Sequence, residues 1–275
     1  MISLAAAFFA AGLPNAAVLQ PVVNMYSKPS ADADVVSQAI YGVNVAILEQ
    51  RQSWARIRTP DDYSGWTPLS ALRTGTPYAV EGRVVQVTSL MAHVYREPSV
   101  TVHAPLLTLP FETRLEVVEE TAEGRWFQVR LVDGRPGWVQ GGDLAFDRKP
   151  LSTAEMLVLS KRFLGLPYTW GGTASFGYDC SGFVQMLERQ RGVSMPRDAQ
   201  PQAEWSGVAP VSRESLEPGD LLYFGSSEKH ITHTGMYLGD NQFIDATTYR
   251  TPMVRIDDLT DPHWVRLLVA ARRIK

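Results

Sequence analysis

The sequence predicts two small all-β barrels followed by an α+β domain. The first observation is an internal repeat in residues 22–148, where turn signals separate short alternating strands. This pattern is typical of small barrels. The second is a change after residue 148, where helical segments precede several strands, which indicates helices packed on an antiparallel sheet. The third is the length of 275 residues, which fits two or three domains of about 100–150 residues each.

Residues 1–21 precede the repeat and are apolar and alanine-rich, and the first charged residue is Lys28. The run from Leu4 to Leu13 is shorter than the ~20 apolar residues that span a bilayer. It fits the core of a signal peptide, although a positively charged start is missing. Two interpretations stay open, an export signal or a leading segment that packs on the first domain. The protein is accordingly exported (periplasmic or secreted) or cytoplasmic.

The internal repeat rests on aromatic and turn motifs that recur in the same order. Each copy has a Tyr-x-x-Pro motif, then a tryptophan, and twelve residues later the tryptophan of a Gly-Trp pair. We therefore predict one β domain over residues 22–75 and a second over residues 76–148. The matching elements of the two copies are Tyr26–Pro29 and Tyr95–Pro98, Trp54 and Trp126, and Gly65-Trp66 and Gly137-Trp138.

The region after residue 148 is predicted to form one domain, residues 149–275. Ser152-Thr-Ala-Glu155 reads as a capping box, so a helix is expected to run to about Leu164. Apolar spacing predicts a second helix from Cys180 to Gln190, with a loop around Arg197 after it. The expected strands are 220–224, a hairpin over 233–246, 253–256 and 265–274.

Cys180 is the single cysteine of the chain, and it stands where a glycine-rich loop meets the second of these helices. Free backbone N–H groups and the helix dipole at such a position stabilise a thiolate. A thiol placed there has a pKa below the usual ~8.5 and can act as a nucleophile. The alternative is a buried core cysteine, since free cysteines are among the most buried residues.

His233 is the histidine best placed to serve as a base for this cysteine. It opens a hairpin whose turn falls near Gly239–Asn241. With the turn centred on Asp240, positions 233, 235, 245 and 247 share one face. Asp245 should then lie within reach of the imidazole of His233. Thiolate, imidazole and an orienting carboxylate would form a catalytic set. The alternative for Asp245 is a solvated residue at the end of a strand.

These residues belong to a series of motifs that strongly resembles the NlpC-type cell-wall peptidases, papain-like cysteine hydrolases of bacterial murein peptides. The resemblance covers about residues 150–275, in the order and spacing of that family. It implies an α+β papain-like fold, with Cys180 as nucleophile and His233 as base. Asp245 stands where the family usually has His, Asn or Gln. The motifs are Pro167-Tyr-x-Trp-Gly-Gly, Asp179-Cys-Ser-Gly-Phe-Val, Pro196-Arg197, Pro218-Gly-Asp-Leu-Leu-Tyr-Phe224, His233-x-Gly and Gly239-x-x-x-Phe-Ile.

The resemblance implies roles for further residues of the catalytic domain. Tyr168 corresponds to a cleft tyrosine whose hydroxyl helps to hold the developing oxyanion, beside a backbone N–H near Cys180; the alternative is a packed loop aromatic. Asp179 and Ser181 match residues that contact substrate in these enzymes. Arg197 is expected to support the wall of the cleft.

The repeated motifs of the N-terminal half resemble bacterial SH3-like domains, which often accompany cell-wall hydrolases. In the relatives that cut soluble murein peptides, a tyrosine and a carboxylate from such a domain cap the free amine of the substrate's L-alanine. Tyr63 is the matching tyrosine, and Glu49 is the candidate carboxylate. The alternative for Glu49 is an exposed charge at the end of a strand. A free ammonium group requires anionic partners.

The expected function is a cysteine peptidase that cuts the bond between γ-linked D-glutamate and an L-diamino acid, meso-diaminopimelate or lysine. The substrate would be a murein tri- or tetrapeptide with a free N-terminal L-alanine. One alternative is another murein amidase or endopeptidase of the superfamily, acting on the intact wall. A second is a non-catalytic wall-binding protein, and a third is a structural protein built on the barrels.

Composition argues against other classes of partner. The net charge is 26 minus 29, or −3, without long runs of either sign, which is unlike nucleic-acid-binding proteins. No Cys/His cluster has metal-ligand spacing, and no phosphate loop or dinucleotide fingerprint occurs. We therefore expect no metal and no cofactor, and we expect the protein to act as a monomer.

Overall fold

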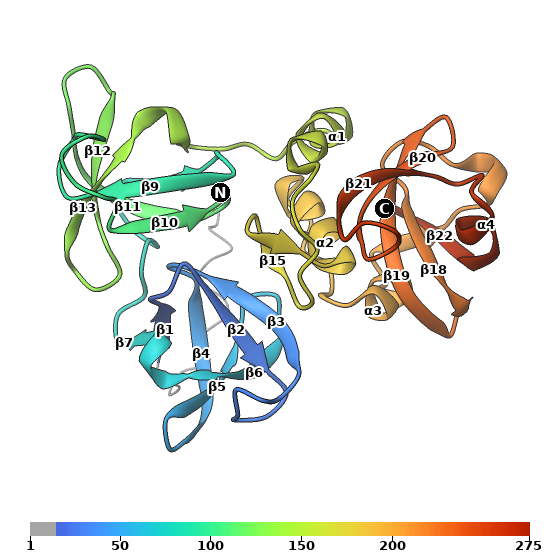
Figure 1. Cartoon of the computed structure of the whole chain (residues 1–275), viewed down its shortest axis with the longest axis horizontal. Helices are drawn as coiled ribbons and strands as arrows, with labels where there is room; N and C mark the ends of the chain where they lie inside the picture. The colour runs from blue at the N-terminus through green and yellow to red at the C-terminus, as the bar shows by residue number, and fades with distance from the viewer. Residues whose placement is uncertain (1–14) are drawn as a thin grey trace. The chain divides into compact units, whose positions relative to one another are not determined.

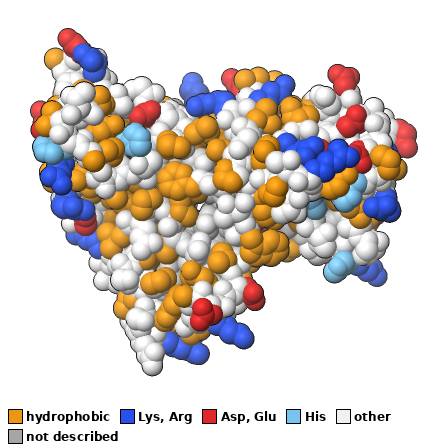
Figure 2. Space-filling model, in the orientation of Figure 1, with side chains coloured by type: hydrophobic (Ala, Val, Ile, Leu, Met, Phe, Trp, Pro, Cys, Tyr) orange, Lys and Arg blue, Asp and Glu red, His pale blue; other side chains and the backbone are white. Residues whose placement is uncertain are grey.

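The computed structural model describes residues 15–275, which form two compact units that divide between Arg148 and Lys149. The first unit consists of strands and short 3-10 turns, and the second combines helices with a sheet (Figure 1). Basic and acidic side chains are visible on both units in Figure 2. Within residues 15–275, no helix is both long enough and apolar enough to span a membrane.

The first seven strands form one antiparallel sheet in the order β3-β2-β6-β5-β4-β1-β7. We call it the first sheet. It buries an apolar cluster that includes Met25 and Ile57. A 3-10 turn over Leu69–Ala71 leads into its last strand. The strands are β1 (Asn15–Val18), β2 (Val22–Tyr26), β3 (Val35–Ile40), β4 (Asn44–Arg51), β5 (Trp54–Arg58), β6 (Ser64–Pro68) and β7 (Leu72–Thr74).

Strand β1 falls inside the segment that the sequence marked as a leader, residues 1–21. It pairs with both β4 and β7, and Ala16, Ala17 and Val18 are buried. The interpretation as a packed segment therefore holds for residues 15–18, because β1 is paired on both edges and three consecutive residues of it are buried. The rest of the predicted leader, residues 1–14, lies outside the described residues.

The next seven strands repeat this topology. Their order, β10-β9-β13-β12-β11-β8-β14, is that of the first sheet with each number raised by seven. We call it the second sheet, and a 3-10 turn over Gly141–Asp143 precedes its last strand. The strands are β8 (Val84–Val87), β9 (Met91–Tyr95), β10 (Leu107–Pro110), β11 (Arg114–Glu120), β12 (Trp126–Arg130), β13 (Pro136–Gln140) and β14 (Leu144–Ala145).

The repeated aromatic residues make the same contact in both copies. Tyr26 meets Trp54 edge-to-face with ring centroids 5.5 Å apart, and Tyr95 meets Trp126 in the same way at 5.7 Å. Edge-to-face packing suits the charge distribution of aromatic rings. The internal repeat predicted from sequence is therefore present in the strand order and in this ring pair.

The second unit is built on a six-stranded antiparallel sheet of order β17-β22-β18-β19-β20-β21. Helices α2 and α3 pack against β19, and α4 packs against β18. A small hairpin, β15 (Thr173–Ala174) and β16 (Gly177–Tyr178), precedes α2. The strands of the sheet are β17 (Val208–Pro210), β18 (Leu221–Ser227), β19 (His230–Gly239), β20 (Gln242–Thr247), β21 (Met253–Asp258) and β22 (Leu268–Ile274).

Two predicted helices of this unit are present. Helix α1 (Thr153–Ser160) begins with the predicted capping box, in which Ser152 accepts from the Glu155 N–H. It ends before the expected Leu164, because a 3-10 turn over Lys161–Phe163 replaces its last turn. Helix α2 spans Cys180–Gln190, which confirms the prediction from apolar spacing.

The sequence-based assignment of 265–274 as a strand is wrong for its first three residues. They complete helix α4 (Pro262–Leu267), and only the rest forms β22. The physical reason is local capping. Asp261 accepts a hydrogen bond from the His263 N–H at 2.9 Å, and Pro262 occupies the first helical position, where a proline is favourable.

The segment after α2 is also more regular than predicted, since Ala199–Glu204 forms helix α3. The hairpin turn between β19 and β20 is confirmed. Asp240 and Asn241 both have positive φ angles, 50° and 59°, as the tight turn of a twisted hairpin requires.

Candidate active site

Cys180 is the first residue of α2, and the preceding residue Asp179 caps the helix. The side chain of Asp179 accepts a hydrogen bond from the Gly182 N–H at 2.7 Å. Within the described part of the chain, the N–H groups of Cys180 and Ser181 have no acceptor. They are the unpaired donors that every helix start leaves. Two donors and the positive end of the helix dipole therefore lie beside the thiol.

Arg197 holds this cap in place from eighteen residues further along the chain. Its guanidinium donates to both oxygens of Asp179, at 3.0 and 2.6 Å, and to Ser181 Oγ at 2.9 Å. The Arg197 side chain is 1% exposed and that of Asp179 is 10% exposed. A buried pair of this kind is strong when every donor and acceptor is used. In this structure, Arg197 positions Asp179 and Ser181.

Close backbone packing fixes the same helix start against the loop that precedes it. Asp179 N–H donates to the Gly172 carbonyl at 3.2 Å. A Cβ atom on Gly182 would lie 2.2 Å from that carbonyl oxygen, so only glycine fits there. Gly182 therefore has a structural reason in this chain.

His233 and Asp245 lie on the neighbouring strands β19 and β20. Nε2 of His233 is 2.7 Å from Oδ2 of Asp245, and the Asp245 side chain is completely buried. The strand register pairs Met236 with Ile244, which is the register expected from a turn centred on Asp240. The predicted contact between His233 and Asp245 is thereby confirmed.

The electrostatics of this pair follow from burial and charge. Burial disfavours the imidazolium of His233, but hydrogen bonds to Asp245 and Cys180 and the charges of both groups outweigh it, so the pKa of His233 rises. Burial raises the pKa of Asp245, although the imidazolium opposes that rise. The site therefore favours a charged imidazole, which is the natural partner of a thiolate.

The position of Cys180 relative to His233 is set by packing, because α2 packs across β19 and β20. Asp245 is hydrogen-bonded to Nε2 of the imidazole, so Nδ1 is the ring nitrogen that remains available to the thiol. Cys180 is 8% exposed and the His233 side chain is 16% exposed. Both can therefore be reached from solvent, whereas Asp245 cannot. This geometry can support attack by sulfur and proton transfer through one imidazole.

Aromatic rings hold the imidazole, and sequence reasoning missed the most important of them. Trp264 of α4 stacks on His233 with ring centroids 5.1 Å apart and an interplanar angle of 23°. Phe224 of β18 lies 5.6 Å away. Both are buried. The capping signal Asp261-Pro262 could have revealed α4, but nothing in the sequence pattern connects Trp264 with His233.

Tyr168 lies in the loop before β15 and is partly buried. Its N–H donates to the Pro252 carbonyl at 3.3 Å. Burial raises the pKa of its phenol, and the negative charges of Cys180 and Asp179 raise it further. The hydroxyl therefore stays protonated at neutral pH and can donate a hydrogen bond near Cys180.

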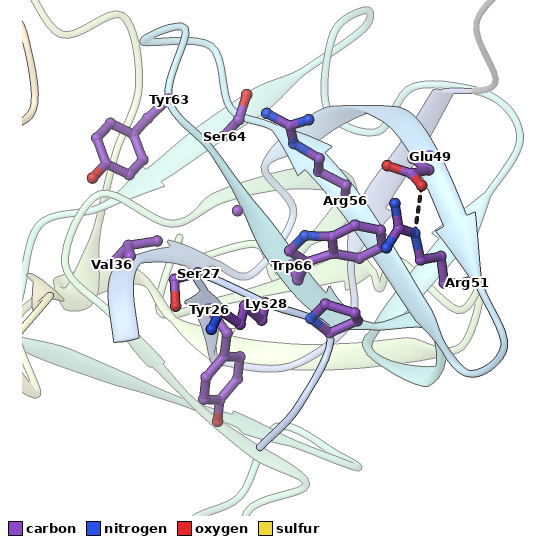
Figure 3. Close-up of a pocket in the computed structure, with 12 residues that line it drawn as sticks. Tyr26, Ser27, Lys28, Val36, Glu49, Arg51, Arg56, Tyr63, Ser64 and Trp66 are labelled. Atoms are coloured by element: carbon purple, nitrogen blue, oxygen red, sulfur yellow. Dashed lines mark hydrogen bonds and ion pairs between the residues drawn. The ribbon is translucent and has the colours of Figure 1, made fainter. Parts of the chain in front are cut away.

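Tyr63 and Glu49, the residues expected to cap a free amine, belong to the first unit. Both line one pocket of about 450 Å³ on the first sheet (Figure 3). Glu49 is already paired, because its Oε1 accepts from Arg51 Nε at 2.5 Å. Its Oε2 has no partner within residues 15–275. The carboxylate therefore has one oxygen left for a ligand.

A helix-borne cysteine beside a histidine that a buried carboxylate orients defines the class of cysteine peptidases. The sequence pattern of the NlpC/P60 family matches residues 165–273, and that of the bacterial dipeptidyl-peptidase SH3 domain matches residues 25–72. A γ-D-glutamyl-L-lysine dipeptidyl-peptidase of Bacillus cereus is 32% identical over 86% of this chain and 74% of its own length. The chain belongs to the NlpC/P60 family.

Other relatives extend over a similar part of the chain. A γ-D-glutamyl-L-lysine dipeptidyl-peptidase of Bacillus subtilis is 28% identical over 88% of this chain and 82% of its own length. Among solved structures, an NlpC/P60 family protein from Bacillus cereus has a TM-score of 0.83 and 24% identity, and covers 94% of this chain and 99% of its own. That structure shares the fold.

Proposed function

We propose that this cysteine peptidase hydrolyses the amide between γ-linked D-glutamate and the L-diamino acid of murein peptides, with Cys180 as nucleophile. The observation that carries the proposal is the buried Asp245 bound to His233 beside the start of α2. The choice of bond is supported by the relatives named γ-D-glutamyl-L-lysine dipeptidyl-peptidase. The diamino acid is diaminopimelate or lysine.

In this mechanism, the Cys180 sulfur attacks the γ-carbonyl carbon of D-glutamate. The carbonyl oxygen gains negative charge, which the N–H groups at the start of α2 and the Tyr168 hydroxyl stabilise. The His233 imidazolium then protonates the departing amine of the diamino acid. A water molecule gives a proton to His233 and attacks the thioester, which releases the D-glutamyl acid and restores the thiolate beside the imidazolium.

Asp245 is the orienting residue of this proposal. A carboxylate on Nε2 fixes the ring so that Nδ1 faces the sulfur, and it stabilises the imidazolium that protonates the amine. Asp179, Ser181 and Arg197 support the helix start, and the same Asp179 and Ser181 are the candidates for contact with the bound peptide.

Selection for a free N-terminal L-alanine is proposed to depend on Tyr63 and Glu49. The support is that both line one pocket and that Oε2 of Glu49 is open. We further propose SH3-like barrels over residues 22–75 and 76–148 and a catalytic domain over 149–275. The identical strand order of the two sheets supports a second SH3-like barrel.

The test is mass spectrometry of the purified protein with L-Ala-γ-D-Glu-diaminopimelate, beside the N-acetylated peptide and the lysine analogue. We expect release of L-Ala-D-Glu from the free peptide and none from a Cys180→Ala control. Cleavage of the acetylated peptide at the same rate would keep the peptidase and reject the amine selection. Absence of cleavage in all peptides would reject the proposed bond.

A further inference from the structure

Trp264 is the ring that joins the imidazole of His233 to the aromatic core of the catalytic unit. Its side chain is buried, and its indole stacks on the imidazole with ring centroids 5.1 Å apart and planes 23° apart. Three further rings hold the indole at centroid distances of 4.9, 5.3 and 5.4 Å, and they belong to Phe224, Phe243 and Tyr249. The indole is therefore fixed from several sides while one of its faces meets His233.

Packing alone does not explain why this residue is a tryptophan. Nε1 of Trp264 is buried and has no hydrogen-bond partner among residues 15–275. A buried indole N–H usually finds an acceptor, and a buried donor without one lowers stability. A phenylalanine would fill apolar space here without leaving a donor unpaired. The property that remains to account for the indole is its large π face.

That face covers a part of His233 that the other partners of the ring leave open. Nε2 is hydrogen-bonded to Asp245, and Cys180 is the second hydrogen-bonding partner of the imidazole. Both act in the plane of the ring, whereas Trp264 lies nearly parallel to it. An aromatic face is partly negative and attracts a cation within about 6 Å of its centroid, and tryptophan does so most strongly. The indole therefore favours the imidazolium over the neutral imidazole.

We propose that Trp264 is a positioning residue of this peptidase, whose indole face holds the His233 ring and stabilises its charged form. The role rests on the proposed function of His233 as the acid that protonates the leaving amine, and does not depend on which bond is cut. Burial by itself disfavours the imidazolium of His233, and a favourable contact on the face of the ring offsets part of that loss.

The charged and titratable groups that act on His233 come from three elements. They are Cys180 of α2, Asp245 of β20 and His263 of α4. Burial lowers the pKa of His263, and the charge of His233 lowers it further, so His263 is uncharged at neutral and alkaline pH. Two residues of β21 act on Asp245 in turn, Arg255 and Asp257. A substitution at position 264 leaves all of these groups in the chain.

The experiment is an NMR titration of the His233 ring in the full-length Cys180→Ala protein, where the imidazole titrates without coupling to the thiol. We expect Trp264→Leu, which removes the π face, to lower the pKa of His233 by about one pH unit. Trp264→Phe keeps a weaker π face, so it should lower this pKa by less. With Cys180 present, the basic limb of kcat/KM should move to lower pH in the same order.

Phe243→Leu is the matched control, because it removes a buried ring of the same cluster. Phe243 meets Trp264 edge-on at 90°, and in the described part of the chain it has no ring contact with His233. It should leave the pKa of His233 in place. If Trp264→Leu does not fold, the comparison of Trp264→Phe with this control decides.

Two results would overturn the inference. One is an unchanged pKa of His233 in the variants of Trp264, which would make the indole a space-filling residue. The other is an equal fall in Phe243→Leu, which would assign the shift to a loosened core. If the pKa falls as expected but the unmodified enzyme cuts no murein peptide, the inference stands and the proposed function fails. If the peptide is cut and the pKa does not move, the proposed function stands and the inference fails.

Discussion

The candidate active site and the pocket of the first sheet place their charged residues in opposite environments. In the catalytic unit, the Arg197–Asp179 pair and the His233–Asp245 pair are largely buried. In the pocket of the first sheet, Arg51 and Glu49 are exposed, with 61% and 38% of their side chains accessible. The comparison teaches that burial holds a charged pair in one geometry, whereas an exposed pair stays accessible to solvent and to a ligand.

The largest effect is expected from breaking the buried pair at the helix start. Arg197→Met leaves Asp179 charged, buried and without its partner, which should lower the free energy of unfolding by about 3–5 kcal/mol. Urea denaturation measures this loss. The matched control is Arg250→Met, since Arg250 pairs with Asp261 but is 61% exposed. It should cost about 0–1 kcal/mol.

An equal loss of unfolding free energy in Arg197→Met and Arg250→Met would show that burial does not set how much an ion pair contributes. The comparison between buried and exposed charges would then fail. The Arg250→Met variant also controls for any general effect of removing an arginine from this unit.

An intermediate effect is expected at the catalytic pair. Asp245→Asn removes the charge that raises the pKa of His233, so this pKa should fall. In the proposed mechanism the imidazolium protonates the leaving amine, so activity should be lost as pH rises through the pKa of His233. The basic limb of kcat/KM should therefore move to lower pH. At neutral pH, kcat/KM should fall by about two orders of magnitude or more.

A pH–rate profile of cleavage, with Asp258→Asn as control, checks this expectation. Asp258 is an exposed carboxylate on β21, so its removal should leave the profile in place. A basic limb that stays fixed in Asp245→Asn would argue that the carboxylate does not act on His233.

The smallest effect is expected from the open charges. Arg56→Gln should change the free energy of unfolding by no more than about 0.5 kcal/mol, because the side chain is exposed and has no ion pair with any residue from 15 to 275. The second sheet has a glutamine, Gln128, at the position that corresponds to Arg56. If thermal or urea denaturation showed that the free energy of unfolding falls by more than about 2 kcal/mol, Arg56 would have a structural role. The contrast between buried and exposed charges would then not hold for this residue.

Much of the candidate site could be predicted because its determinants are local. The helix start at Cys180 follows from polar and glycine residues next to an apolar repeat. The contact of His233 with Asp245 follows from a turn centred on Asp240 and the alternation of side chains along strands. Both arguments need only a short stretch of chain.

The parts that could not be predicted depend on contacts between distant segments. Arg197 lies eighteen residues after Asp179, and no periodicity sets the distance between them. Trp264 reaches His233 only because α4 packs against β18. Arg51 and Glu49 are close in sequence, so their ion pair is a local feature. The pocket that they line also needs Arg56 and Trp66, which come from other strands.

Strand β1 has a consequence for how the N-terminal segment can be processed. It lies between β4 and β7, so a chain trimmed beyond Val18 would leave both of those strands with unpaired N–H and C=O groups. Such open edges recruit strands from other molecules and lead to aggregation. Any protease that matures this protein without harm must therefore cut before Asn15, which sets a physical limit on where a leader can end.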